Sequence, residues 1–358
     1  KMGNPLVIIT LVFVLYAFFG KYVPGFLNQP GMTVKKFINL IYLTTSGIWG
    51  TPLYASASYV VIFVLLGAIM SVSGIGDYFT SLATSAFGSF RGGPAKVAVV
   101  ASGLFGSISG SPTANVIGTG SFTIPMMKKN GFEDEYAAAV EATASTGGAI
   151  MPPIMGSTAF VMAEMIGVPY SSIAAAALIP AILYFLSILF AVDIHAAKHG
   201  LKGVSRDQLP SLRSMVKEIY KIFPLVFLVL CMSVFKCTVT RSGLYTVAMT
   251  LLIVELDPKT RLTKEQWLQI PIQTAKSAVS VGVACAMAGI ISGVIMGSGL
   301  GFRISSVLTT VAGHSMLLLL VLTMVVSLIM GMGVPTTAAY LVLAALVAPT
   351  LTQLGIST

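Results

Sequence analysis

The sequence predicts an all-α polytopic membrane protein, built as an inverted repeat with two re-entrant helical hairpins and broken helices. The first observation is composition: 56% of the 358 residues are hydrophobic, only 9% are charged and the mean hydropathy is +0.91, whereas soluble domains are about one quarter charged. The second is a series of apolar tracts long enough to cross a bilayer. The third is that small residues, prolines and threonines interrupt apolar sequence once in each half, in the same register.

Apolar tracts near the ~20 residues that a bilayer core requires predict the membrane-crossing helices. These tracts lie at 52–72, 173–192, 221–235, 241–256 and 272–297. Residues 5–20 are also expected to form a membrane helix, because no small-residue cleavage site follows the apolar run. Amphipathic spacing over Thr33–Ser46 predicts an interfacial arm helix, and Thr263–Ile270 occupies the corresponding place in the second half.

The basic residues indicate the membrane topology. The formal net charge is +9, and lysines and arginines concentrate between Asp193 and Lys221 and again around Arg261. The positive-inside rule places both segments in the cytoplasm. Because topology accounts for the charge and no basic patch interleaves with aromatic residues, we expect no nucleic-acid partner. With these two anchors the hairpins open to opposite faces of the membrane, as an inverted repeat requires.

The two interrupted stretches predict the hairpins. The first, 94–129, has arms that are each shorter than the ~30 Å bilayer core, so it is expected to enter from the cytoplasm and turn back at a tip formed by Ser107–Thr113. The second hairpin covers 314–353, with its tip at Gly331–Thr337. Each tip therefore places unpaired backbone inside the membrane, where it needs partners.

A helix over 139–167 follows the first hairpin, and it is expected to break at Gly147–Pro153. The broken helix would supply the wall that faces the first tip. Its counterpart in the second repeat would begin beyond Thr358, so we expect the chain to be C-terminally truncated.

The two tips and the break form the candidate binding site. Carbonyls at the end of a half-helix, together with hydroxyl oxygens, suit a sodium ion, and N–H groups at the start of the next half-helix suit a carboxylate. The candidate substrate- and ion-binding residues are Ser107, Ser109, Gly110, Ser111, Pro112, Thr113, Asn115, Ser145, Thr146, Gly147, Gly148, Pro152, Pro153, Gly331, Gly333, Pro335, Thr336 and Thr337. We expect Na⁺ near Ser109, Gly147 and Gly333. Helix packing and kinks are the alternative explanation, which the recurrence of the break in register disfavours, but Asn115 suits packing as well as binding.

Acids within spanning segments are candidates for ion coupling. Glu141 lies just before the break and is a candidate proton or ion relay, whereas Glu164 is expected nearer the outer interface. The histidines show no zinc or nucleophile pattern, and no catalytic triad or phosphate-binding loop is present. We therefore expect no enzymatic activity and no cofactor. The three cysteines are expected to fill the core: Cys231, Cys237 and Cys285.

Three motifs resemble the large membrane (permease) subunit of tripartite ATP-independent periplasmic (TRAP) transporters: FGSISGSPTANVIGTGSFTIPMMKKNGF, EATASTGGAIMPPIMGSTAFVMAEMIGVPY and GMGVPTTAAYLVLAALVAP. The chain is most similar to the fused-permease branch that works with TAXI-type binding proteins, and the resemblance covers about 33–358. It implies an elevator-type secondary transporter in a bacterial or archaeal inner (cytoplasmic) membrane. Such a permease imports an organic acid, usually a carboxylate, that a TAXI-type periplasmic protein delivers, by symport with Na⁺ or alternatively H⁺. It also implies a small membrane subunit or a fused equivalent.

The resemblance and the repeat together divide the chain into six segments. They are 1–32, an N-terminal membrane helix (scaffold or small-subunit remnant); 33–93, the first arm and scaffold; 94–170, the first hairpin and broken helix of a transport domain; 171–220, a membrane helix and cytoplasmic loop; 221–313, the second scaffold and arm; and 314–358, the second hairpin of the transport domain.

Other functions fit less well. A related symporter could bind a carboxylate directly, without a soluble binding protein, and the short loops do not distinguish it. An ion channel is disfavoured because the tips block a straight pore and no charged ring lines one. A non-transporting scaffold would have little use for two symmetric breaks at mid-membrane depth. Neutral oxygens at the tips favour sodium as the coupling ion, while Glu141 keeps a proton route open.

Overall fold

The fold was analysed in a computed structural model. It describes residues 4–205, 209–210, 212–258, 260–300, 303, 316–331, 336–337, 339–341 and 343–344. These residues form helices and turns and include no strand. The chain divides into two compact units: unit 1 contains Lys1–Ser58, Glu164–Gly167 and Ser277–Thr358, and unit 2 contains Tyr59–Ala163 and Val168–Lys276.

Unit 2 holds the first hairpin and the helices around it. Its helices are α4 (Val61–Val72), α5 (Ile75–Phe87), α6 (Gly93–Ser109), α7 (Pro112–Lys129), α8 (Asp134–Gly147), most of α9 (Ser157–Ile166), α10 (Tyr170–Lys198), α11 (Leu212–Lys217), α12 (Phe223–Ser233) and α13 (Val239–Leu256). Unit 1 holds α1 (Asn4–Phe19), α2 (Val34–Tyr42), α3 (Thr51–Ala55) and α16 (Met316–Gly331). A π-helical turn, Ser56–Val60, joins α3 to α4, and α14 (Lys264–Ser298) has residues in both units.

The apolar helices agree with a polytopic membrane protein. Within the described residues, four helices are long and apolar enough to span a bilayer: Thr51–Val72, Tyr170–Lys198, Val239–Leu256 and Lys264–Ser298. Each contains a tract that the sequence predicts as a crossing. The tract at 221–235 forms the shorter apolar helix Ile219–Ser233, and α1 covers most of the predicted helix at 5–20.

The segment predicted as the first arm forms the helix α2, whereas the segment predicted as the second arm is the first part of a longer helix. Thr33 caps α2, and the apolar side chains of Val34, Ile38 and Tyr42 on α2 are exposed, as an interfacial helix requires. In the second half no separate arm exists, because α14 runs without a break for 35 residues through Pro271. A proline inside a helix removes one backbone hydrogen bond, and membrane helices tolerate that loss, so Pro271 does not end the helix.

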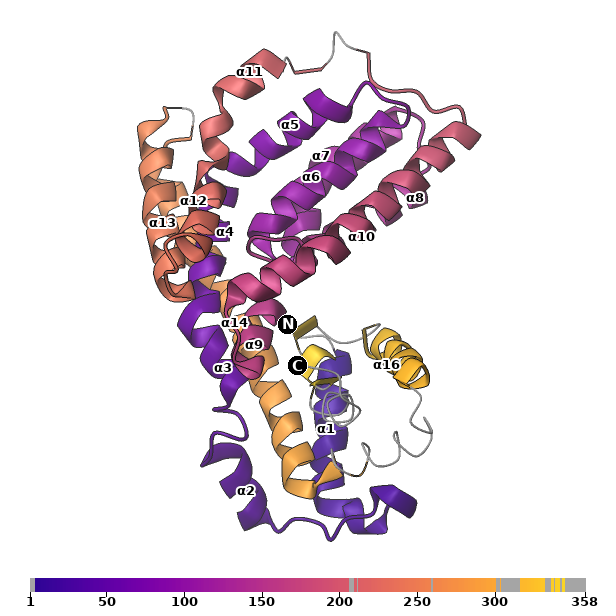
Figure 1. Ribbon diagram of the computed structural model, residues 1–358, viewed down its shortest axis with the longest axis vertical. Helices are drawn as coiled ribbons and strands as arrows, with labels where there is room; N and C mark the ends of the chain where they lie inside the picture. Colours follow the sequence, from indigo (N-terminus) through magenta and orange to yellow (C-terminus); the bar gives the residue numbers. More distant parts are fainter. Residues whose placement is uncertain are drawn as a thin grey trace. The chain divides into compact units, whose positions relative to one another are not determined.

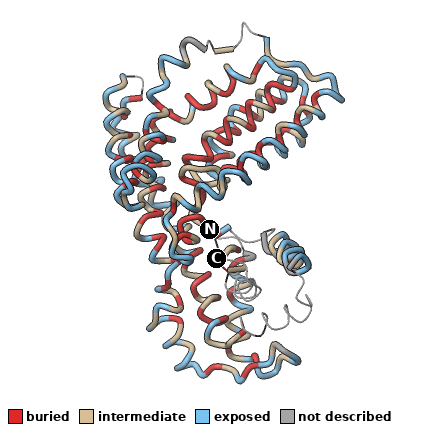
Figure 2. Tube along the Cα trace, viewed as in Figure 1, coloured by how far each residue is buried: buried red, intermediate tan, exposed pale blue. Residues whose placement is uncertain are grey.

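The first hairpin is a pair of packed helices, α6 and α7, which run side by side in Figure 1. Gly110 ends α6 in the left-handed conformation (φ 58°), Ser111 caps α7 by accepting a hydrogen bond from the N–H of Ala114, and Pro112 takes the first helical position. Buried residues concentrate along α6, as Figure 2 shows. Alanines such as Ala95 and Ala98 allow α8 and α10 to pack closely against it. The re-entrant position of this hairpin in a bilayer stays a prediction.

Candidate functional site

The tip of the first hairpin docks onto the break between α8 and α9. The backbone N–H of Ile154, in the break, donates to the carbonyl of Ser107, with an N···O distance of 3.1 Å. A side chain on Gly110 would place its Cβ 1.9 Å from the carbonyl oxygen of Met155, so only glycine fits there. The predicted tip and the predicted break therefore form one joint within unit 2.

A crossing of two glycines draws the hairpin and the break together one turn below the tip. A Cβ on Gly106 would lie 2.3 Å from the Cα of Gly148, and a Cβ on either glycine would lie 2.8 Å from Nδ2 of Asn115. The backbones of α6 and of the break are therefore in direct contact at Gly106 and Gly148, and the Asn115 side chain packs beside them.

Asn115 is fully buried and links three helices. Its Nδ2 donates to the carbonyl of Ser102 on α6 at 2.8 Å and to the carbonyl of Ser145 on α8 at 3.4 Å. Its Oδ1 accepts from the hydroxyl of Thr119, one turn along α7, at 3.3 Å. The structure therefore gives Asn115 the packing role, and its role in binding stays a prediction.

Glu141 lies at the centre of a buried cluster of hydroxyl groups. Its side chain is 0% exposed. Oε1 accepts from Ser102 at 3.0 Å, from Thr119 at 2.6 Å and from Ser145 at 2.9 Å, and Oε2 accepts from Thr123 at 2.5 Å. In the described part of the chain no lysine or arginine pairs with this carboxyl group. Hydrogen bonds from neutral donors, rather than an ion pair, satisfy it.

Three of these hydroxyls lie within hydrogen-bond distance of a second oxygen. Thr119 Oγ1 is 2.9 Å from the carbonyl of Asn115, Thr123 Oγ1 is 3.0 Å from the carbonyl of Thr119, and Ser102 Oγ is 3.1 Å from Thr119 Oγ1. Because a hydroxyl rotates, each can turn from the carboxyl group to that second oxygen. A protonated Oε2 of Glu141 would then donate a hydrogen bond to Thr123 Oγ1, while Thr123 Oγ1 donates to the carbonyl of Thr119. The cluster thus fits both the ionised and the protonated acid.

Ser109, the last residue of α6, carries a buried polar atom that lacks a partner in the described structure: its Oγ makes no hydrogen bond. Buried polar groups are normally paired, so such an atom calls for an explanation. A hydroxyl oxygen at a half-helix C-terminus is the type of ligand that suits Na⁺. The described residues contain no group of three or more His, Cys, Asp or Glu side chains that could hold a metal ion. A cation near Ser109 would therefore be held mainly by neutral oxygens.

Several predicted residues lie outside this cluster. Thr113 and Thr146 are exposed, and the Thr146 hydroxyl donates to Ala142 of its own helix at 2.8 Å. Gly147 faces α10, where a Cβ would lie 2.4 Å from the ring of Tyr184, so it acts as a packing residue. Pro152 and Pro153 form the break itself, and Tyr170 donates to the carbonyl of Pro153 at 3.1 Å. Glu164 is exposed at the end of α9.

Only part of the second predicted tip lies within the described residues. Gly331 ends α16, while Gly333 and Pro335 lie outside the described residues. Thr336 and Thr337 are helical, and Thr337 is buried. They belong to unit 1, so a meeting of the two tips stays a prediction.

Sequence reasoning missed three members of the Glu141 cluster: Ser102, Thr119 and Thr123. The available signal was periodicity, because Asn115, Thr119 and Thr123 recur every four residues and therefore share one face of α7. Ser102 gives no such signal, since only the packing of α6 against α8 brings it to the carboxyl group.

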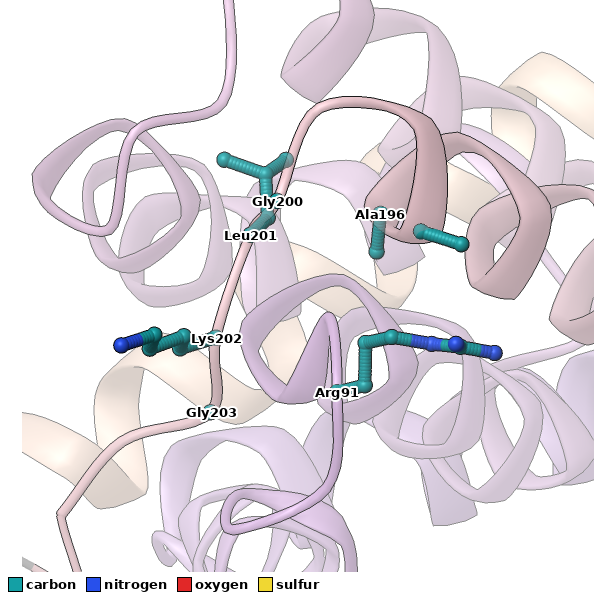
Figure 3. A pocket seen from close by; sticks show the side chains of 7 residues that line it. Arg91, Ala196, Gly200, Leu201, Lys202 and Gly203 are labelled. Carbon is teal, nitrogen blue, oxygen red and sulfur yellow. The ribbon is translucent and has the colours of Figure 1, made fainter.

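A basic pocket lies at the other end of the hairpin. Arg91 precedes α6 and, together with Lys96, pairs with Asp193 of α10, the Lys96 Nζ–Oδ1 distance being 2.6 Å. The hydrogen bond to Asp193 raises the pKa of Arg91 above its usual value. Arg91 and Lys202 line a cavity of about 390 Å³ beside the end of α10, and their side chains point in different directions (Figure 3). The length of α6 separates this pocket from the tip, so it is not part of the candidate site.

Comparisons with known proteins agree on one family. A family model described as "Tripartite ATP-independent periplasmic transporter, DctM component" matches residues 1–358. The chain is 30% identical over 196 residues to the uncharacterized protein y4mL of Sinorhizobium fredii, covering 53% of this chain and 46% of that protein. It is 34% identical over 134 residues to the C4-dicarboxylate TRAP transporter large permease protein DctM of Vibrio cholerae, covering 37% of this chain and 29% of that one.

A third relative is the isethionate TRAP transporter permease protein DctMQ of Oleidesulfovibrio alaskensis, 27% identical over 146 residues, or 41% of this chain and 23% of that protein. The matched part is less than half the length of each of these three relatives.

Proposed function

The chain belongs to the DctM component family of tripartite ATP-independent periplasmic transporters, and we propose that it imports an organic acid that a periplasmic binding protein delivers. Uptake is coupled to an ion, Na⁺ in the first instance, and proceeds by an elevator movement of the hairpin-bearing part. The named relatives transport C4-dicarboxylates and isethionate, both organic acids, which supports an anionic substrate. The protein works in the inner membrane with a TAXI-type binding protein and with a small membrane subunit or fused equivalent.

The observation that carries this proposal is the joint between the hairpin tip and the broken helix. The joint leaves the N-terminus of α7 at Ser111–Thr113 accessible, and the positive end of the helix dipole there favours a carboxylate. Ser109, whose hydroxyl is unpaired, lies just before this turn and is the last residue of α6. The dipole at a helix C-terminus favours a cation. These two features adjoin at one turn, which supports coupled binding of an organic anion and Na⁺ there.

The Glu141 cluster supports H⁺ as the alternative coupling ion. A buried carboxyl group that fits both protonation states, only one helical turn before Ser145, could carry one proton per cycle. In that case Na⁺ would be dispensable, and uptake would follow the pH gradient.

The test is uptake of labelled carboxylates into proteoliposomes that contain the full-length protein. Binding protein is added or omitted, and an inward Na⁺ or H⁺ gradient is imposed separately. We expect uptake only with the binding protein and with the Na⁺ gradient. Uptake driven by the H⁺ gradient alone would select the alternative ion, and uptake without binding protein would indicate a symporter that binds its substrate directly. Flux that needs no gradient would refute symport.

A further inference from the structure

The turn between α12 and α13 carries two of the three cysteines. Cys231 is buried in the last turns of α12, and Cys237 is half-buried just before Thr238, the residue that caps α13. Both thiols are free, and both residues belong to unit 2. Sequence reasoning predicted that all three cysteines fill the core, but the partial exposure of Cys237 distinguishes it from the fully buried Cys285.

The backbone fixes the distance between these two cysteines. The N–H of Cys237 donates to the carbonyl of Cys231, with an N···O distance of 2.9 Å. Standard bond lengths and angles then hold the two Cα atoms at most about 6.2 Å apart. Disulfides join Cα atoms separated by about 4.4–6.8 Å. The separation of the two Cα atoms therefore satisfies the distance that a disulfide requires.

The turn is well defined on both sides. The N–H groups of Val234 and Phe235 both donate to the carbonyl of Leu230, at 2.9 and 3.0 Å, and Lys236 reverses the chain with a φ of 48°. These bonds and the bond from Cys237 to Cys231 hold the backbone of Cys237 beside the last turn of α12.

The topology predicted from the sequence puts this turn in an oxidising compartment. The positive-inside rule predicts that the basic segment before α12 is cytoplasmic, and the predicted crossing at 221–235 would bring the chain to the opposite face. Disulfides form and persist outside the cytoplasm.

We propose that Cys231 and Cys237 are a redox-active pair that closes to a disulfide across the extracytoplasmic turn, with a small-molecule or protein disulfide as oxidant. The thiolate of Cys237 attacks one sulfur of the oxidant and releases one thiolate. The thiolate of Cys231 then attacks the Cys237 sulfur of this mixed disulfide and releases the second. The two leaving thiolates take up the two protons that the cysteines lose, so one disulfide is exchanged for another. This inference does not depend on the transported substrate or the coupling ion.

The test uses the full-length protein, purified in detergent and oxidised with glutathione disulfide. Remaining thiols are blocked with iodoacetamide after denaturation, and the protein is digested with trypsin. Cleavage after Lys236 separates the Cys231 peptide from the Cys237 peptide. We expect one linked species that reduction splits into these two peptides. Cys285, on a third peptide, is the internal control and should carry the alkyl group.

Two single variants complete the test. Cys231→Ser should leave Cys237 as a stable glutathione adduct, and Cys237→Ser should leave Cys231 alkylated, because Cys231 is buried. The proposal is overturned if the wild-type protein gives alkylated peptides or two separate glutathione adducts. Oxidation of whole cells with membrane-impermeant glutathione disulfide should give the same link. A link that forms only in purified protein would overturn the extracytoplasmic placement.

Discussion

Replacing Gly106 with alanine tests the contact that joins the hairpin to the broken helix. The new Cβ would lie 2.3 Å from the Cα of Gly148 and 2.8 Å from Nδ2 of Asn115. Carbon atoms make favourable contact only at about 3.5–4.0 Å, so the two backbones must separate by about 1 Å. The bond from Asn115 to the carbonyl of Ser145, which is already 3.4 Å long, would be lost.

The expected change in the free energy of unfolding is the sum of three contributions. Forcing a methyl group into a tight core costs ~1–3 kcal/mol, and a lost buried hydrogen bond costs ~1 kcal/mol more. Alanine's better helix propensity returns ~1 kcal/mol. The net loss of ~1–3 kcal/mol should lower the melting temperature by about 2–12 °C, since 1 kcal/mol corresponds to ~2–4 °C in domains of 150–250 residues. The assay is thermal unfolding of purified protein in one detergent.

Gly67→Ala is the matched control. Gly67 lies on α4 and also faces the tip, but its Cβ would be 3.6 Å from the Cα of Ser109, an ordinary contact. Because the control gains helix propensity without a clash, its melting temperature should stay unchanged or rise slightly. Equal losses in both variants, or no loss in Gly106→Ala, would refute the inferred packing.

Three further predictions concern the site. Glu141→Ala should destabilise the protein by ~2–4 kcal/mol in the same melting assay. Glu141→Gln should cost less than half of that, because its amide oxygen still accepts hydrogen bonds from the hydroxyls. Similar losses in the two variants would contradict the hydroxyl cluster. Ser109→Ala should leave stability unchanged, since its hydroxyl has no partner, but it should raise the Na⁺ concentration for half-maximal uptake several-fold. Ser121→Ala is the exposed control. Unaltered Na⁺ dependence of uptake would exclude Ser109 as a ligand. Tyr170→Phe should lower the free energy of unfolding by ~1–2 kcal/mol, and an unchanged denaturation midpoint would show that its bonds to the break contribute nothing.

Local chemistry made the hairpin predictable, and packing between helices did not. A glycine, a serine cap and a proline follow one another at 110–112, and each has a known place at the junction of two helices. The crossing helices were predictable from apolar length alone. The partners of Glu141 were not, because Ser102 reaches the carboxyl group only through the register of α6 on α8. Thr146 lies outside the cluster because a helix turns by about 100° per residue, so Thr146 does not share the buried face of Ser145.

The second arm shows where local rules mislead. Pro271 is a recognised helix breaker, yet α14 continues through it. In apolar surroundings the remaining backbone groups are satisfied best by staying helical, so one missing bond is tolerated.

The docking of the tip onto the break limits which surfaces could separate in the proposed transport cycle. The bond from Ile154 to Ser107 and the glycine crossing tie α6 to the segment that follows α8 at two levels. Pulling them apart would expose the buried carboxyl group of Glu141 and its hydroxyl partners at once. In the proposed elevator movement the hairpin and the broken helix would therefore move as one rigid piece. A solute carried by that movement would enter and leave across their other surfaces and not between them.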